Sequence, residues 1–75
     1  MEIEERIRKD IGIFSDNIKK IELEKLDGKE KDVVELAKMY ASDASSWLEK
    51  KDYYTSFSSI AYAHGLLDAV LKMEG

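Results

Sequence analysis

The sequence predicts an all-α fold, a three-helix up-down-up antiparallel bundle in a single domain over residues 1–75. Apolar residues recur at steps of three and four along almost the whole chain, which is the spacing of amphipathic helices. Only two short breaks interrupt this period, one at residues 26–28 and one at residues 51–52. Because short connections force neighbouring helices to run antiparallel, these two breaks define the topology of the bundle.

The first helix is expected over residues 2–26. Its apolar residues form one seam, and charged residues occupy most of the other positions. The seam consists of Ile3, Ile7, Ile11, Phe14, Ile18 and Ile21. Such a stripe predicts a helix with one buried face. Ile13 points off the seam, where it is either a plain surface residue or part of an association patch.

The second helix is expected over residues 29–50. Asp27, followed three residues later by Glu30, predicts a capping box at its start. Gly28 is also a candidate for the C-terminal cap of the first helix. The predicted seam of the second helix consists of Val33, Ala37, Tyr40, Ala44 and Trp47.

The third helix is expected over residues 52–73, with Asp52 as its N-cap. Residues 52–75 carry four charged side chains, against fourteen in residues 1–27, so we expect this helix to be covered by more than one neighbour. Its predicted seam consists of Tyr53, Phe57, Ile60, His64, Leu67 and Leu71.

Small residues four apart on the third helix predict the close approach of another helix. Ala61, Gly65 and Ala69 form this ridge, and an interior glycine costs a helix roughly 1 kcal/mol relative to alanine. Counting residues through the two turns places Gly12 near the level of Gly65. We therefore expect the first and third helices to pack closely where the two glycines meet.

Composition argues against several classes of protein. The chain has no cysteine, so it has no disulfide and no thiolate metal site. A formal net charge of −4 with both signs interleaved argues against nucleic-acid binding, which needs a basic patch. No apolar run approaches the roughly 20 residues that span a bilayer, and the first residues lack the pattern of a signal peptide. We expect a cytoplasmic protein without a membrane partner.

His64 and Asp68 lie four residues apart, which places them on one face of the third helix, and counting through the turn puts Tyr40 level with His64. Three interpretations are open. His64 is a core residue hydrogen-bonded to Tyr40 or Asp68, or part of a metal or small-ligand site, or a general acid-base catalyst. We favour the core residue, because two ligands do not complete a metal site.

Several enzyme classes lack their required residues in this chain. There is no phosphate-binding glycine loop and no Glu-x-x-His pair of the di-iron bundles. A helical ribonuclease that uses an arginine a few residues before its histidine is also excluded, because the only arginines, Arg6 and Arg8, are far from His64 in the sequence. We therefore assign no catalytic residue, no cofactor and no metal ligand. The numerous serines are interpreted as solvent-facing or small packing residues.

Tyr62 differs from most other aromatic residues because it points away from the predicted seam. An exposed Tyr62 beside Ala69 would mark a contact surface for a partner, and the alternative is a merely amphipathic surface tyrosine. A chain of 75 residues has a small core and gains stability from association. We expect a non-enzymatic interaction module that binds a protein partner or forms a homodimer through its third helix. The competing expectation is a small-ligand or metal-binding protein that uses His64, Asp68 and Tyr40 between the second and third helices.

Two runs of the sequence resemble a known family. The run KKDYY at residues 50–54 and the run YAHGLLDA at residues 62–69 are similar to the signature of an archaeal family catalogued as domain of unknown function 357. The resemblance covers about half of the chain, and the second run is its more specific part. It implies an all-helical bundle and an archaeal source, and it implies no established activity.

Overall fold

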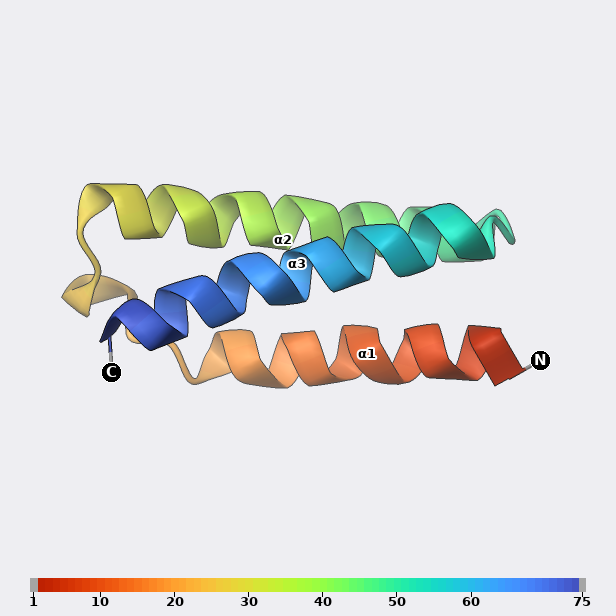
Figure 1. Ribbon diagram of the computed structural model, residues 1–75, viewed down its shortest axis with the longest axis horizontal. Coiled ribbons are helices and arrows are strands. Elements are labelled where there is room, and N and C mark those ends of the chain that lie inside the picture. The colour runs from red at the N-terminus through yellow and green to blue at the C-terminus, as the bar shows by residue number, and fades with distance from the viewer. Residues whose placement is uncertain (1, 75) are drawn as a thin grey trace.

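The computed structural model describes residues 2–74, which form three long helices and one short turn of 3-10 helix. The helices are α1 (Glu2–Lys19), α2 (Gly28–Glu49) and α3 (Tyr53–Glu74), and η1 (Leu23–Lys25) lies between the first two. They pack side by side in an elongated bundle of 39 × 16 × 15 Å. The α2 helix runs antiparallel to both of the others (Figure 1). These features confirm the predicted all-α, three-helix fold.

The first helix ends earlier than expected. It was predicted to reach residue 26, but α1 ends at Lys19 and the chain continues through η1. Leu26 is buried beyond this turn, where it packs with Val34 and Val70. Burying Leu26 across the end of the bundle requires the chain to leave the axis of α1, so tertiary packing overrides the helical period in this segment.

Both predicted N-caps are present. The backbone N–H of Glu30 donates to Asp27 Oδ1 at 2.8 Å and the N–H of Asp27 donates to Glu30 Oε1 at 3.2 Å, which completes the capping box of α2. Asp52 accepts from the N–H of Thr55 at 3.1 Å and from its hydroxyl at 2.9 Å. Gly28 is the first residue of α2 and therefore does not cap α1.

The turn between α2 and α3 depends on one residue with a positive φ. Lys51 has a φ of 65°. Its N–H donates to the carbonyl of Leu48 and the N–H of Asp52 donates to the carbonyl of Trp47, both at 3.0 Å. This pair of bonds is a Schellman motif, in which glycine is the usual left-handed residue. A lysine at this position carries conformational strain because its Cβ crowds the backbone.

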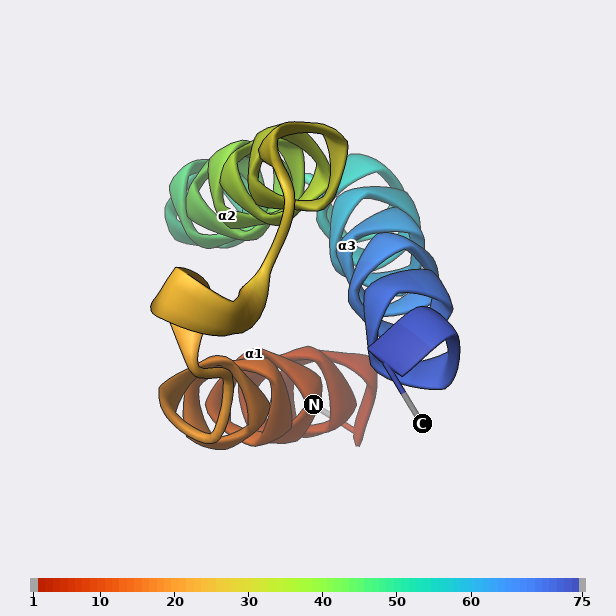
Figure 2. The same ribbon diagram turned by 90° about the vertical axis from the view of Figure 1, so that its left-hand side faces the viewer.

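The α2 and α3 helices form the most closely packed pair, and α1 makes fewer contacts with either of them. The residues that this pair buries are Val34, Ala37, Ala41, Ala44 and Leu48 on α2, and Ser56, Ile60, Ala63, Leu67 and Val70 on α3. Small side chains are common in both sets, and they allow the two backbones to approach closely. The end-on view shows α1 lying across the open side of this pair (Figure 2).

The buried stripe of α3 is offset from its predicted seam. Of the six seam residues, only Ile60 and Leu67 are buried. The stripe that faces α2 passes instead through Ser56 and Ala63. The prediction followed the largest side chains, whereas small side chains occupy the contact and the aromatic ones lie at its edges. This offset turns His64 toward α1.

Ser56 supplies a hydrogen bond inside the core. Among the side chains of residues 2–73, it is the only buried polar one. Its hydroxyl donates to the carbonyl of Ala44 at 2.6 Å, which joins α3 to α2. The serines were expected to be solvent-facing or small packing residues. Ser56 is a packing residue, and it also links two helices.

The predicted close approach of α1 and α3 at two glycines is wrong. Gly12 and Gly65 are exposed, and a Cβ added to either would meet nothing within 4 Å beyond its own stretch of helix. Ala61 and Ala69 are also exposed. Because the buried stripe is offset, this ridge of small residues lies on the solvent-exposed side of α3.

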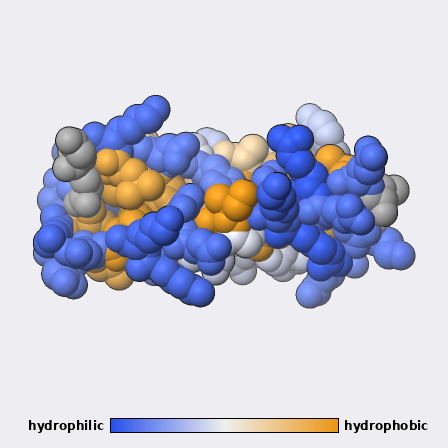
Figure 3. Space-filling view, turned by 90° about the horizontal axis from the view of Figure 1, so that it is seen from below, coloured by the Kyte–Doolittle hydropathy of each residue, from blue (hydrophilic) through white to orange (hydrophobic). Residues whose placement is uncertain are grey.

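The surface on the side of α1 is largely polar. A view from this side shows hydrophilic residues over most of the surface, interrupted by separate apolar areas (Figure 3). Ile7 and Phe14 of α1 are buried against the rest of the bundle, whereas Ile13 is 41% exposed. The α1 helix therefore has one face in the core and a charged face toward solvent.

Candidate functional site

His64 lies between α3 and α1 and is half-buried. Its Nε2 is 2.8 Å from the backbone carbonyl oxygen of Asp10. A carbonyl oxygen only accepts, so Nε2 carries the proton in this hydrogen bond. The ring also forms a T-shaped contact with the ring of Phe14, with centroids 5.7 Å apart and an interplanar angle of 85°. His64 thus ties α3 to α1.

The predicted partners of His64 are wrong. Its hydrogen bond goes to the backbone of Asp10 and not to Tyr40 or Asp68. Asp68 is exposed, and Tyr40 contacts Tyr62 instead. The structure therefore does not assemble the expected His/Asp/Tyr cluster between α2 and α3. Among the side chains of residues 2–73, no group of three or more His, Asp or Glu is placed to hold a metal ion.

Tyr40 of α2 contacts Tyr62 of α3, whereas the hollow between α2 and α1 is lined by other α2 residues, such as Lys38 and Ser42. The ring centroids of the two tyrosines are 4.7 Å apart at an interplanar angle of 79°. Tyr40 is half-buried, and Tyr62 is 52% exposed. This contact sets the level of one helix against the other. Because the helices are antiparallel, residues before Tyr40 lie beside residues after Tyr62.

Apolar side chains continue from the two tyrosines along both helices at steps of three and four. We call this surface the outer face, and it consists of Val33, Leu36, Tyr40, Tyr62, Leu66, Ala69 and Met73. A hollow at its end, beside Asp27, is lined by Val33 together with Met73. The rows on α2 and α3 therefore run side by side.

The outer face presents apolar surface to solvent. Met73 is 65% exposed, and Leu36 is 37% exposed. Along the α2 row, the next charged residues are Lys29 at one end and Asp43 at the other. Tyrosine and methionine are enriched in protein contacts. The exposed Tyr62 beside Ala69 that the sequence indicated is therefore part of a larger apolar surface.

Of the α2 half of the outer face, only Tyr40 was predicted as a site residue, and it was grouped with His64 and Asp68 instead of Tyr62. Val33 and Tyr40 were assigned to the core seam, and both are half-buried at its edge. The available signal was a second row of apolar residues on α2, at positions 33, 36 and 40, one position away from the buried stripe. The contact between Tyr40 and Tyr62, together with the hollow that Val33 shares with Met73, shows that this row joins α3.

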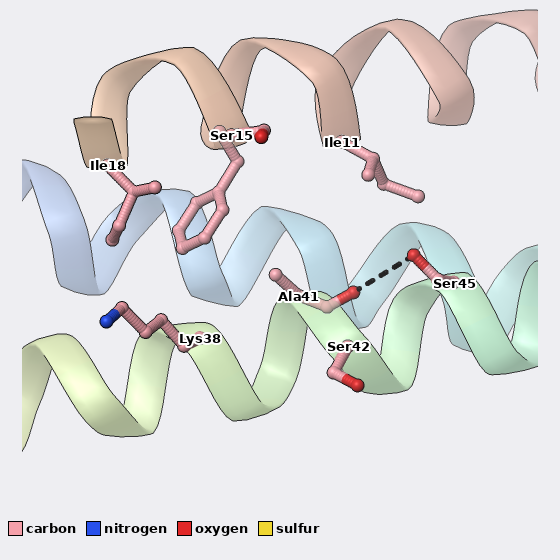
Figure 4. Close-up of a pocket in the computed structure, with 8 residues that line it drawn as sticks. Ile11, Ser15, Ile18, Lys38, Ala41, Ser42 and Ser45 are labelled. Atoms are coloured by element: carbon pink, nitrogen blue, oxygen red, sulfur yellow. Dashed lines mark hydrogen bonds between the residues drawn. The ribbon is translucent and has the colours of Figure 1, made fainter.

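A second hollow, of about 220 Å³, lies between α1 and α2 (Figure 4). It is lined by Ile11, Phe14, Ser15, Ile18, Lys38, Ala41, Ser42 and Ser45. The Ser45 hydroxyl donates to the carbonyl of Ala41 in its own helix at 3.5 Å, and Lys38 pairs with Glu35 at 3.4 Å. These polar groups are engaged within α2, so we assign no ligand to this hollow.

Glu4 provides a polar link at the far end of the bundle. It accepts a hydrogen bond from Arg8 at 3.0 Å and one from the Tyr53 hydroxyl at 3.5 Å. The hydrogen bond from Arg8 lowers the pKa of Glu4 below its ordinary value of 4.5; desolvation opposes this shift, and the positive charges of Arg8 and Lys51 add to it. Glu4 thus connects the start of α1 with the start of α3.

The fold and its surfaces define a small all-helical protein with one partly exposed apolar face. The chain belongs to the family described as "Protein of unknown function (DUF357)", which it matches over residues 9–75. This match confirms the resemblance seen in the sequence. None of the curated proteins compared with the chain matches it. No helix within residues 2–74 is both long enough and apolar enough to cross a membrane.

Proposed function

We propose that this protein is a non-enzymatic interaction module that binds another protein chain through the outer face. The observation that carries this proposal is the pair of apolar rows centred on Tyr40 and Tyr62, of which Tyr62 is 52% exposed. Covering exposed apolar surface is favourable by about 25 cal/mol per Å². Tyrosine side chains near the centre of such a surface commonly act as its main anchors.

The alternative function, a small-ligand or metal-binding protein, has no comparable support. His64 is bonded to α1, Asp68 is exposed and Tyr40 lies against Tyr62. In the described part of the chain, His64 is hydrogen-bonded to Asp10 and Tyr40 packs on Tyr62, so neither of these interactions supports a shared site.

Site-specific photo-cross-linking in cells tests the proposal. A photoreactive amino acid is placed at position 62 and, as a matched control, at Ile13, which is 41% exposed on α1. We expect one defined protein to be captured at position 62 and not at position 13. With that protein purified, Tyr62→Ala should weaken binding by roughly tenfold or more. Equal capture at both positions, or none, would refute the proposal.

A further inference from the structure

We infer that the chain that covers the outer face is a second copy of this protein, packed antiparallel about a two-fold axis at the level of Leu36 and Leu66. The inference rests on the proposed function, because it takes the outer face as the contact surface. It is carried by the charges at the two ends of that face and by the sizes of the side chains between them.

The α2 row of the outer face ends in Lys29, beside the capping-box carboxylates Asp27 and Glu30, and at its opposite end in Asp43. Lys29 and Asp43 continue the α2 row of the outer face at helical spacing, and both are exposed. Each lies seven residues from Leu36, which is about 10 Å along a helix. Neither takes part in an ion pair with another side chain in the described part of the chain.

This charge pattern is complementary to itself. The two-fold axis lies in the contact plane, perpendicular to the helices and at the level of Leu36. It lays α2 of one copy antiparallel on α2 of the other. Lys29 then faces Asp43 of the second copy, and Asp43 faces its Lys29. Each residue of an isologous contact is used twice in this way, so the two copies form two equivalent ion pairs.

The side chains between the charges also fit this arrangement. The same axis brings Leu66 against its counterpart and sets Tyr62 over Ala69 of the second copy, because these residues lie four before and three after Leu66. Ala69 is exposed and small, so it leaves room for the tyrosine ring. A large side chain over a small one gives the close packing that apolar contacts require.

The parallel arrangement is less favourable. The Tyr40–Tyr62 contact places Lys29 level with Met73 and Asp43 level with Ser59. A parallel second copy would face its α3 toward this α2, so Lys29 would lie over Met73 and Asp43 over Ser59. Neither charge would then meet an opposite one, and the apolar rows would lie against each other without ion pairs at their ends.

Charge reversal tests the inference. In sedimentation equilibrium, the mass of the wild-type protein should rise from 8.6 kDa toward twice that value as the concentration increases. K29D and D43K each place like charges together twice, so each should raise the dissociation constant about tenfold. The K29D/D43K double variant should recover the wild-type constant. A mixture of the two single variants should form mixed dimers more tightly than either variant forms its own. Circular dichroism verifies that each variant remains helical.

The contrary outcomes separate this inference from the proposed function. A mass of 8.6 kDa from micromolar to millimolar concentration would overturn the second copy, as would a dimer that neither charge reversal weakens. Photo-cross-linking at position 62 is a separate measurement that tests whether the outer face is the contact surface. Capture of this chain supports both proposals, and capture of an identified different protein whose binding is reproduced with purified components supports the function alone. No capture above the Ile13 control overturns both.

Discussion

Lys51 occupies a backbone position that suits glycine better than any residue with a side chain. Its φ of 65° is required by the two hydrogen bonds that end α2, and a Cβ is unfavourable in that region. The two hydrogen bonds of the turn therefore offset the conformational strain at Lys51. The same turn brings Asp52 into place to cap α3, so a single residue controls how the second helix passes into the third.

Replacing Lys51 by glycine should raise the free energy of unfolding by about 0.5–1 kcal/mol, because glycine adopts the left-handed conformation without strain. Lys50 is the matched control, since its φ of −80° is ordinary and glycine there should give no gain. Urea unfolding measures both variants. A loss of stability in Lys51→Gly would show that the lysine side chain contributes more than its backbone strain costs.

Glu4 should make stability depend on pH at the acid end. Its pKa is lowered in the folded state by the hydrogen bond from Arg8, so its contribution is present above the ordinary value of 4.5 and is lost as the pH falls through the lowered pKa. Glu4→Gln should therefore lower the melting temperature at neutral pH but not at strongly acid pH. A melting-temperature difference that is the same at every pH would rule out this linkage.

At the scale of elements, the rotation of α3 decides which residues can form a site. The three helices, apart from the end of α1, and both N-caps could be predicted from the sequence because they depend on spacings of three or four residues, as in Asp27 and Glu30. The rotation could not, because two adjacent stripes of α3 are both apolar. One contains the large residues Phe57 and His64, and the other contains Ser56 and Ala63. Packing against the alanines of α2 selects the second stripe.

Gly65 tests this rotation directly. Because a Cβ at this position meets nothing within 4 Å, Gly65→Ala should stabilise the protein by roughly 0.5–1 kcal/mol through helix propensity alone. Ala63→Leu, two residues earlier and fully buried, should destabilise it by about 1–3 kcal/mol through overpacking. Thermal unfolding compares the two variants, and the reverse order of stability would mean that the rotation is wrong.

Ser56 tests the contact between α2 and α3. Removing its hydroxyl with Ser56→Ala leaves the carbonyl of Ala44 without this donor and should lower stability by about 0.5–1.5 kcal/mol. The control is Ser58→Ala on the exposed surface of α3, which carries the same change in helix propensity and should alter stability by less than about 0.5 kcal/mol. Equal effects in chemical denaturation would indicate that the buried bond contributes nothing.

At the scale of the whole molecule, the bundle divides its surface into regions of different character. The side of α1 that faces solvent is largely hydrophilic (Figure 3), while α2 and α3 together leave the outer face partly exposed. The sequence indicated Tyr62 and Ala69 as contact residues but grouped Tyr40 with His64 instead of Tyr62, because no spacing within one helix reveals which residue of another helix lies beside it. A chain of 75 residues has a small core, so covering this face would also stabilise the fold.

The most direct measurement of the central claim is a dilution series followed by two-dimensional NMR of the ¹⁵N-labelled protein. We predict concentration-dependent shifts of the backbone amides of Leu36, Tyr40, Tyr62 and Ala69, and unchanged shifts at Ile13 on α1. A partner identified by cross-linking at position 62 should shift the same amides when it is added. Shifts confined to α1, or to the hollow between α1 and α2, would contradict the assignment of the outer face as the contact surface.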